Sequence, residues 1–277
     1  MNPAGKTILI TGSTDGVGRV VALRLGAAGA NVLVHGRDRQ RGEDVVAQID
    51  RAGGSAALHT ADLSSLDAVR KLAEAVRAEH GRLDVLVNNA GIGTASEGRQ
   101  RRESRDGYEL RFAVNYLAGF LLTRLLLPLI RASTPARIVN VASLGQHPID
   151  FDDVMLTRGY DGGRAYAQSK LAQIMFTFDL ARELAGTGVT VNCLHPATYM
   201  DTTMVRASGI SPVSTVAEGA DAILDLAISD GLEGKTGLFF DRQRVSRANA
   251  QAYDEAARKR LRELSYRLTG LAAADAR

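Results

Sequence analysis

Short apolar runs alternate with helix-length segments along almost the whole chain, and this alternation constrains the fold more than any other feature. The runs are continuous rather than interleaved with polar residues, which indicates strands buried on both faces, as in a parallel sheet. The segments between them have helical periodicity. The strands expected from this pattern are 7–10, 31–34, 56–59, 84–87, 138–141, 189–194 and 236–240. The expected helices include 17–28, 39–51, 65–80, 120–130 and 165–185.

Strand–helix alternation over the whole length predicts the α/β class, with a single doubly wound Rossmann-type parallel sheet flanked by helices. Nothing in the sequence looks like a linker, a repeat or a low-complexity segment. The 277 residues, 45% of them hydrophobic, suffice for one large, well-filled core. We therefore expect one domain over residues 1–277.

The first expected strand runs directly into a glycine-rich turn that opens a helix. Gly12 would allow the tight turn, Gly16 the approach of a pyrophosphate, and Gly18 close helix–strand packing. The free N–H groups at the helix start would face the phosphates. A glycine-rich turn alone is weak evidence, but this position predicts a dinucleotide site. The expected cofactor contacts here are Gly12, Ser13, Thr14, Asp15, Gly16, Val17 and Gly18.

The end of the second expected strand bears on the type of dinucleotide. A site for NAD(H) usually places an acidic residue there to bind the ribose 2′-hydroxyl. This chain has Val34-His35-Gly36-Arg37 instead, and the Arg37 guanidinium could bind a 2′-phosphate through two hydrogen bonds. The alternative is a solvated arginine, and Asp15 and Asp38 would oppose a phosphate. We expect NADP(H) rather than NAD(H) and assign His35 no role.

Two further loops follow expected strands on the same edge of the sheet. Asp62, followed by Leu63, could accept a hydrogen bond from the adenine amino group, although a helix N-cap explains Asp62 nearly as well. Asn89, Ala90 and Gly91 follow the fourth strand at its carboxyl end, where open α/β sheets bind ligands. We expect all five residues to contact the cofactor.

Tyr166 and Lys170 lie four residues apart near the start of a long expected helix and therefore share one helix face. An ammonium beside a phenol lowers the tyrosine pKa, so the hydroxyl could exchange a proton with a carbonyl or alcohol oxygen. Such a pair alone is common in helices. Here Ser143 ends an expected strand, and Asn115 is a polar residue on an apolar helix that needs a buried partner such as a carbonyl or a water.

Taken together, these residues resemble the short-chain dehydrogenase/reductase family over residues 6–242. The matching pieces are TGSTDGVG at 11–18, NNAG at 88–91, Asn115, Ser143 and YAQSK at 166–170. Within the family, segments 106–120 and 164–196 are most similar to the branch that contains retinol dehydrogenases and light-dependent protochlorophyllide reductases.

The resemblance implies hydride transfer between NADP(H) and the carbonyl or alcohol group of a fairly hydrophobic small molecule. It implies that Tyr166 is the acid/base and that Lys170 both lowers the Tyr166 pKa and binds the nicotinamide ribose. Ser143 would orient the substrate oxygen, and Asn115 would hold a water that relays protons from Lys170 to solvent.

The chain departs from the usual family pattern in three places. The long Ser143–Tyr166 interval predicts a flap over residues 144–163, and a mobile lid is expected over 199–212. Pro196 is followed by alanine where the family usually has glycine, and we expect Pro196 and Thr198 beside the nicotinamide carboxamide. The retinol branch often carries an N-terminal membrane anchor, whereas this sequence starts almost on the first strand, so we expect none.

Composition excludes several other classes. The longest apolar run, 120–130, contains Thr123, Arg124 and Pro128 and predicts a buried helix rather than a membrane span. The single cysteine, Cys193, excludes a disulfide framework and a multi-cysteine metal site, so we expect no metal and a cytoplasmic setting. The net charge of +3 is only mildly basic. The arginine cluster Arg99, Arg101, Arg102 and Arg105 lacks interleaved aromatic residues, so we expect a solvated loop and no nucleic-acid partner.

Two other functions remain alternatives. A regulator that senses NADP(H) without turnover would have little reason to keep Asn115, Ser143, Tyr166 and Lys170 together. A sugar-nucleotide epimerase or dehydratase would need a different glycine spacing and a larger substrate domain. The resemblance also suggests a homodimer or tetramer packed through the helices around Asn115 and Tyr166, and leucines on several sides of helix 120–130 support it. In the alternative, a monomer, the flap and the C-terminal helix near 248–264 cover these faces.

Overall fold

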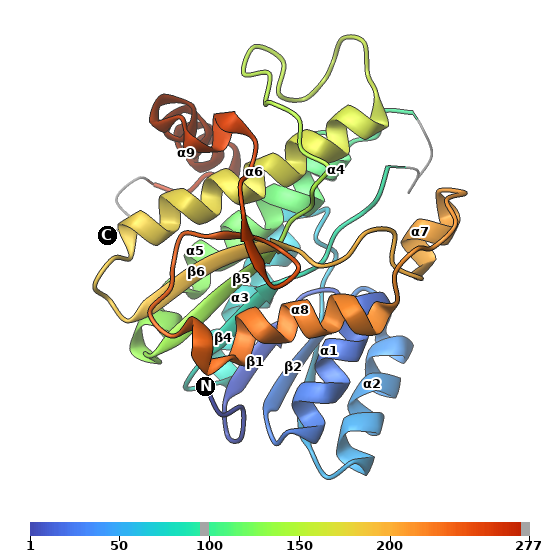
Figure 1. Ribbon diagram of the computed structural model, residues 1–277, viewed down its shortest axis with the longest axis vertical. Coiled ribbons are helices and arrows are strands. Elements are labelled where there is room, and N and C mark those ends of the chain that lie inside the picture. The colour runs from blue at the N-terminus through green and yellow to red at the C-terminus, as the bar shows by residue number, and fades with distance from the viewer. Residues whose placement is uncertain (95–99, 273–277) are drawn as a thin grey trace.

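Figure 1 shows a computed structural model of the chain, in which residues 1–94 and 100–272 are described. This part contains one sheet with strand order β3-β2-β1-β4-β5-β6-β7-β8, which confirms the predicted doubly wound Rossmann-type fold. Arg99 of the arginine cluster lies outside the described residues. The strands are β1 (Thr7–Ile10), β2 (Asn31–Gly36), β3 (Ser55–Thr60), β4 (Val85–Asn88), β5 (Ala136–Val141), β6 (Val189–His195), β7 (Phe239–Asp241) and β8 (Arg244–Ser246).

The sheet is parallel from β3 to β7, as the continuous apolar runs predict, and only β7 and β8 pair antiparallel. Strand β7 begins at Phe239, three residues later than the expected strand 236–240. Strand β8 was not expected. It is three residues long, and its Arg244 and Val245 are exposed, so it leaves no apolar run in the sequence.

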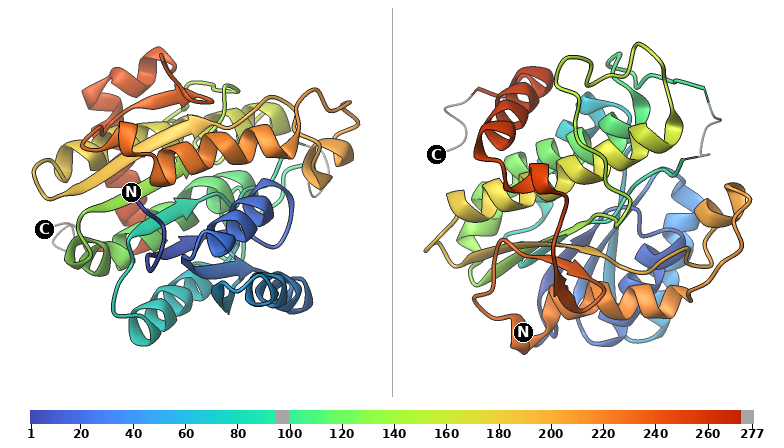
Figure 2. Two further views of the ribbon diagram at one scale, coloured as in Figure 1. Left: turned by 60° about the horizontal axis from the view of Figure 1, so that its bottom comes forward. Right: turned by 45° about the horizontal axis from the view of Figure 1, so that its top comes forward.

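Helices cover both faces of the sheet (Figures 1 and 2). One face carries α1 (Gly16–Ala27), α2 (Arg39–Arg51) and α8 (Val216–Ile228), and the other carries α3 (Leu66–Glu79), α5 (Ala118–Ala132) and α6 (Gly162–Glu183). Side-chain N-caps fix where many of these helices begin. Ser65 caps α3, as expected, whereas Asp161 starts α6 three residues before its expected position.

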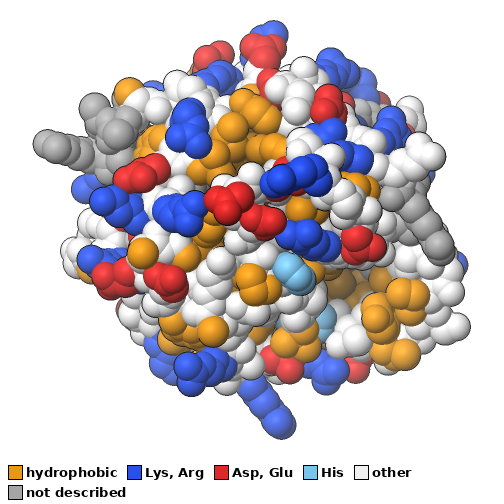
Figure 3. Space-filling model, turned by 90° about the horizontal axis from the view of Figure 1, so that it is seen from above, with side chains coloured by type: hydrophobic (Ala, Val, Ile, Leu, Met, Phe, Trp, Pro, Cys, Tyr) orange, Lys and Arg blue, Asp and Glu red, His pale blue; other side chains and the backbone are white. Residues whose placement is uncertain are grey.

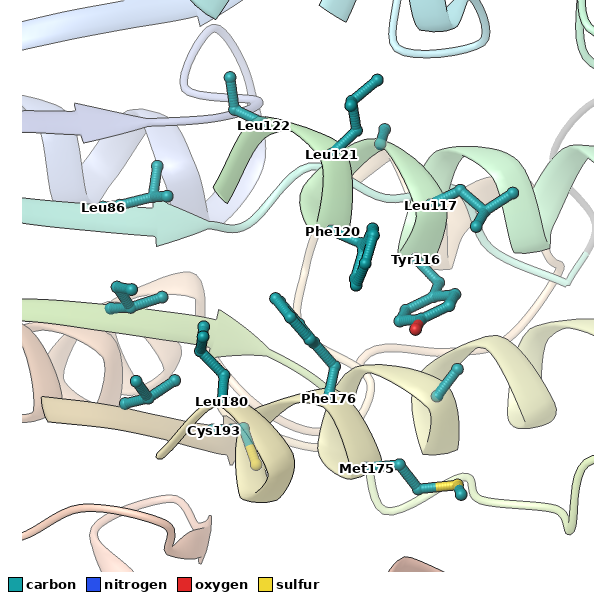
Figure 4. Close-up of a cluster of buried hydrophobic side chains, with 14 of the residues drawn as sticks. Leu86, Tyr116, Leu117, Phe120, Leu121, Leu122, Met175, Phe176, Leu180 and Cys193 are labelled. Carbon is teal, nitrogen blue, oxygen red and sulfur yellow. The ribbon is translucent and has the colours of Figure 1, made fainter. Parts of the chain in front are cut away.

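The helix before β5 is not regular. It begins as α4 (Leu110–Phe112), continues through the π-helical turn η1 (Ala113–Leu117) and ends as α5. Residues 110–132 are long and apolar enough to span a membrane by length and composition alone, but 72% of their most apolar window is buried in the protein. Figure 4 shows this packing, in which Phe120 of α5 faces Phe176 of α6 with ring centroids 5.1 Å apart. The segment is a core helix of the fold.

The C-terminal helix α9 (Glu255–Thr269) covers the outer side of α5 and α6. Its Tyr266 ring stacks edge-on against Phe120, and its Ser265 hydroxyl bonds the Tyr116 hydroxyl at 2.6 Å. The Arg124 guanidinium lies 5.4 Å from the Tyr266 ring centroid and also contacts the Phe120 ring. The aromatic face of these helices is therefore buried within the chain, as in the monomer alternative. The expected homo-oligomer stays a prediction, without support from this face.

The Arg124 guanidinium is buried, and we expect its carboxylate partner to matter for stability. Arg124 Nη1 lies 2.6 Å from Glu183 Oε1, and that carboxylate side chain is only 26% exposed. Glu183→Gln should lower the free energy of unfolding by about 2 kcal/mol, because it leaves a buried cation without its counter-charge. The matched control is Glu255→Gln on α9, whose ion pair with Arg182 is exposed and should contribute less than about 1 kcal/mol. Urea unfolding compares the two, and equal losses would contradict the assignment.

Candidate active site

The glycine-rich turn lies between β1 and α1, at the carboxyl edge of the sheet. Gly12 has a φ of 67°, and a Cβ atom there would lie 2.9 Å from the Cα atom of Ala90, so conformation and space both require glycine. A Cβ atom at Gly18 would lie 2.4 Å from the Gly12 carbonyl oxygen. Asn89 Nδ2 donates to the carbonyl oxygens of Thr11 and Gly12 at 2.8 and 3.2 Å. These contacts hold the turn, α1 and the loop after β4 together.

His35 supports this turn from β2, a role the sequence did not reveal. Its Nδ1 accepts from the Gly12 N–H at 3.1 Å, so the ring contacts the turn directly. Burial, with a smaller effect of nearby His59, lowers the His35 pKa to about 4, so the neutral ring remains an acceptor. The Ser13 N–H donates to the His35 carbonyl oxygen, and the Ser13 hydroxyl accepts from the His35 N–H, both at 2.9 Å. Ser13 therefore shapes the turn through its N–H and hydroxyl groups.

Arg37 is exposed at the end of β2, where the sequence predicts a cation for the 2′-phosphate. It forms no ion pair with any residue in 1–94 or 100–272. The two carboxylates expected to oppose a phosphate lie near Arg41, at 3.7 Å for Asp15 and 3.6 Å for Asp38. Each of them also caps a helix, Asp15 through the Gly16 N–H and Asp38 through the Arg41 N–H. Their charges are partly offset, which leaves Arg37 available for an anion.

The other predicted cofactor residues lie in the loops after β3 and β6 and in the glycine-rich turn with the first turn of α1. Asp62 Oδ1 accepts from the Ser64 N–H at 3.0 Å, whereas Ser65 caps the helix, so the helix-cap alternative for Asp62 is wrong. Thr198 Oγ1 lies 3.1 Å from His195 Nε2, just after β6. The remaining ones are half-buried Thr14 and buried Val17, Leu63 and Pro196.

Asn115 lies in η1, opposite the loop after β4. Its Oδ1 accepts from the Ile92 N–H at 2.8 Å, and its Nδ2 donates to the Ile92 carbonyl oxygen at 3.2 Å and to Ser169 Oγ at 3.0 Å. The predicted buried partner is thus a backbone carbonyl. A Cβ atom at Gly91 would lie 3.2 Å from Asn115 Oδ1 and 3.5 Å from Lys170 Nζ. The π-helical turn, a feature frequent at functional sites, therefore brings Asn115 to Lys170 across Gly91.

Tyr166 and Lys170 lie on one face of α6, and Ser143 faces them from beyond the end of β5. Lys170 Nζ lies 5.8 Å from the centroid of the Tyr166 ring. The Gly145 N–H donates to Ser143 Oγ at 3.0 Å, and a Cβ atom at Gly145 would lie 3.7 Å from Cε1 of Tyr166. The fold therefore brings all four predicted catalytic residues to one end of α6.

Burial controls the protonation of Tyr166 and Lys170. It lowers the pKa of Lys170 to about 7, and the Nζ atom donates to the Val141 carbonyl oxygen and to Gln173 Oε1, both at 2.9 Å. It raises the pKa of Tyr166 above its usual value, against the smaller, opposite effect of a hydrogen bond with Ser143. Removal from water thus sets the direction of the shift, and the expected lowering of the Tyr166 pKa by Lys170 stays a prediction. The Tyr166 hydroxyl therefore keeps its proton to a higher pH than a free tyrosine does.

A buried ion pair that the sequence analysis missed joins the expected flap to the loop after β4. Arg111 and Glu109 are almost fully buried. Arg111 donates to the carbonyl oxygens of Gly93 and Thr94 at 3.0 and 2.7 Å and to the Tyr160 hydroxyl at 2.6 Å. The Tyr160 hydroxyl in turn donates to Glu109 Oε1 at 3.0 Å. One feature of the sequence could have indicated this pair. Glu109 and Arg111 are opposite charges two residues apart at the start of an apolar helix. The pair fixes the end of the flap to the segment that carries Asn115.

The segment after β6 contacts the glycine-rich turn. It contains the short helix α7 (Thr203–Ala207), which was not expected. Thr203 Oγ1 donates to Asp15 Oδ2 at 3.0 Å, and a cavity of about 330 Å³ lies between the two segments. Large hydrophobic side chains are exposed in the expected flap, in the expected lid and directly after the lid. These side chains are Leu144, Tyr199, Met204, Ile210 and Val213. Figure 3 shows a hollow bordered by hydrophobic groups.

Comparison with known proteins agrees with this geometry. The family model described as short chain dehydrogenase matches residues 6–211. The chain belongs to the short-chain dehydrogenase/reductase family. Human retinol dehydrogenase 11 is 37% identical over 280 residues, covering 96% of this chain and 86% of that protein, and human retinol dehydrogenase 13 is 37% identical over 295 residues, covering 99% and 87%. These relatives place this short-chain dehydrogenase/reductase in the retinol dehydrogenase branch.

Several solved structures have the same fold. An uncharacterised protein from Mycobacterium paratuberculosis has a TM-score of 0.78 at 29% identity, covering 96% of this chain and 94% of its own. The Pseudomonas aeruginosa RhlG/NADP complex has a TM-score of 0.70 at 30% identity, covering 87% and 97%. The landomycin C-6 ketoreductase LanV, with bound NADP and rabelomycin, has a TM-score of 0.68 at 30% identity, covering 87% and 96%.

The lowered pKa of Lys170 gives this short-chain dehydrogenase a testable pH dependence. Below about pH 7 the folded protein carries a buried ammonium, which opposes folding. Above that pH the folded state releases the proton while the unfolded chain keeps it up to its ordinary pKa near 10.5, so the penalty fades as pH rises. Between about pH 7 and pH 8.5, wild type should gain about 1.6 kcal/mol of unfolding free energy over Lys170→Met. Denaturant unfolding at both pH values measures this gain, and parallel pH profiles would contradict the assignment.

Proposed function

We propose that the protein is an NADPH-dependent reductase of ketones or aldehydes on fairly hydrophobic small molecules. The observation that carries the proposal is the convergence of Asn115, Ser143, Tyr166 and Lys170 at the carboxyl edge of the sheet, beside a glycine-rich turn. The raised Tyr166 pKa keeps the phenol protonated, and a protonated phenol can donate to a carbonyl oxygen.

The residues present fit a bound dinucleotide. Gly12, Gly16 and Gly18 leave the first turn of α1 open to a pyrophosphate, because side chains there would collide with the turn or add strain. When bound, the nicotinamide cofactor supplies or accepts the hydride. Arg37 would bind the 2′-phosphate, and several solved relatives are NADP or NADPH complexes, such as those from Pseudomonas aeruginosa and Escherichia coli.

Each catalytic side chain has one proposed role. Ser143 donates a hydrogen bond to the substrate oxygen, and Tyr166 gives that oxygen its proton. Lys170 binds the nicotinamide ribose, and in its protonated form it favours loss of the phenol proton. Asn115 holds the Ile92 carbonyl group in place through its side-chain amide. The loop after β4, which contains Ile92, is thereby positioned to bind a water that relays protons.

The substrate class rests on the hydrophobic side chains of the flap and lid. Leu144, which follows Ser143, and Tyr199, which lies in the expected lid, are about half exposed. The relatives named retinol dehydrogenases and the ketoreductase LanV support a bulky apolar substrate. NADPH oxidation, followed by absorbance with a panel of apolar ketones and aldehydes, separates this enzyme from an NADP(H)-sensing regulator, which would bind the cofactor without turnover.

The proton-donor role predicts the effect of removing one hydroxyl. Tyr166→Phe should lower turnover by at least about 100-fold, the usual scale for a general acid, while NADPH binding survives. Steady-state kinetics and fluorescence titration with NADPH measure the two effects. Tyr253→Phe, which alters an exposed tyrosine on the C-terminal side, is the matched control. Near wild-type turnover in Tyr166→Phe would remove this residue from the mechanism.

The cofactor preference predicts a second, independent effect. Arg37→Ala should weaken NADPH binding by roughly 1.5–3 kcal/mol, the range for hydrogen bonds to charged groups, because the 2′-phosphate loses its cation. Binding of NADH, which lacks that phosphate, should change little. Calorimetric titration with both cofactors tests this, and equal losses would show that Arg37 does not bind the 2′-phosphate. Arg39→Ala, on the exposed start of α2, is the control.

A further inference from the structure

Two histidines from distant parts of the sequence meet beside the edge strand β3, outside the site described above. His59 is a buried residue of β3, and His80 caps the carboxyl end of α3. Their Nε2 atoms lie 3.1 Å apart, and their rings are edge-on with centroids 5.3 Å apart. Glu79, the last residue of α3, completes the group, because one carboxylate oxygen and the two ring nitrogens lie within 4.8 Å of one another.

The spacing of the two imidazole nitrogens is close to that in a zinc site. Two imidazole nitrogens bound to one Zn²⁺ at 2.0–2.1 Å lie about 3.4 Å apart at the tetrahedral angle. The observed 3.1 Å between His59 and His80 is close to this value. Two imidazoles and one carboxylate form a donor set that suits zinc and leaves a fourth position for water.

The local backbone explains how two adjacent residues reach the same point. Glu79 still belongs to α3, whereas His80 has extended backbone angles, φ −129° and ψ 124°. Successive residues of a continuous helix point about 100° apart. The change of conformation at the helix end removes this divergence, and both side chains approach His59. His80 is half-buried and Glu79 is exposed, so an ion could enter from solvent.

We propose that His59, Glu79 and His80 bind one divalent transition-metal ion, with Zn²⁺ the best fit to the donors, and that the ion fastens the end of α3 to β3. Strand β3 is at the edge of the sheet and pairs only with β2. Strands β2, β1 and β4 separate it from β5, which precedes Ser143. The ion would therefore stabilise the fold and take no part in hydride transfer. The proposal does not depend on the proposed function.

The competing explanation is a metal-free hydrogen bond between two neutral imidazoles, one donating and one accepting. Untagged, chelator-treated protein, titrated with ZnCl₂ by calorimetry and followed by thermal unfolding, distinguishes the two. The proposal predicts one equivalent of bound Zn²⁺. It also predicts a melting temperature higher by roughly 5 °C or more at a free zinc concentration about 100 times the dissociation constant. Absence of stoichiometric binding, or of the shift, would overturn the proposal in favour of the imidazole pair.

Single substitutions locate the ion. His80→Ala should abolish both the binding and the shift, and Glu79→Gln should weaken zinc binding by at least about tenfold, since even groups behind the ligands contribute that much. His147→Ala, which removes an exposed histidine of the flap, should leave the titration unchanged. Zinc bound equally well by His80→Ala would place the ion elsewhere and overturn the proposal, as would an unchanged affinity in Glu79→Gln.

His59 is buried, so His59→Ala can prevent folding and is not used as a test. A spectroscopic measurement on the wild-type protein takes its place. Co²⁺ in the same chelator-treated protein should give the visible absorption of a tetrahedral nitrogen–oxygen site, and His80→Ala should lose it. A spectrum of octahedral, solvent-like Co²⁺ in the wild type would contradict the assigned donor set. Circular dichroism of each variant checks that the helices are retained.

Discussion

The parallel pairing of β1, β4, β5 and β6 is the constraint on which the rest of the structure depends. Because parallel strands all end at the same edge of the sheet, the loops that follow them must meet there. The glycine-rich turn follows β1, the Asn89 loop follows β4, and Ser143 follows β5. The Asn89 side chain then bonds the carbonyl oxygens of Thr11 and Gly12, so the meeting becomes a fixed contact.

Desolvation sets the chemistry of the site that this edge creates. Lys170 and Tyr166 are removed from water, and each neutral form is favoured, Lys170 with a pKa of about 7 and Tyr166 with a raised pKa. His35 is neutral for the same reason and can therefore accept from the Gly12 N–H. A fold that buries its titratable groups thus keeps the Tyr166 phenol protonated and a hydrogen-bond acceptor beneath the turn.

Helix α9 and the expected flap decide what this protein adds to the common fold. Tyr266 and Ser265 of α9 cover the aromatic face of α5 and α6, where the resemblance suggested a second subunit. Arg111 and Glu109 bind Tyr160 of the flap through buried, charge-assisted hydrogen bonds. Breaking such a pair exposes a buried charge to an apolar environment, so the flap should be held in one position at this end.

The sequence by itself determined the sheet, the glycine-rich turn and the four candidate catalytic side chains, because continuous apolar runs, turn glycines and helix spacing are local properties. It missed β8, which is too short and exposed to leave an apolar run. It also missed the π-helical turn that aims Asn115 at Ile92. Only the tertiary structure decided the protonation of Tyr166, the partners of Arg111 and the meeting of His59 with His80. Each of these depends on burial or on contact between distant segments, and neither quantity is a property of residues that are neighbours in the chain.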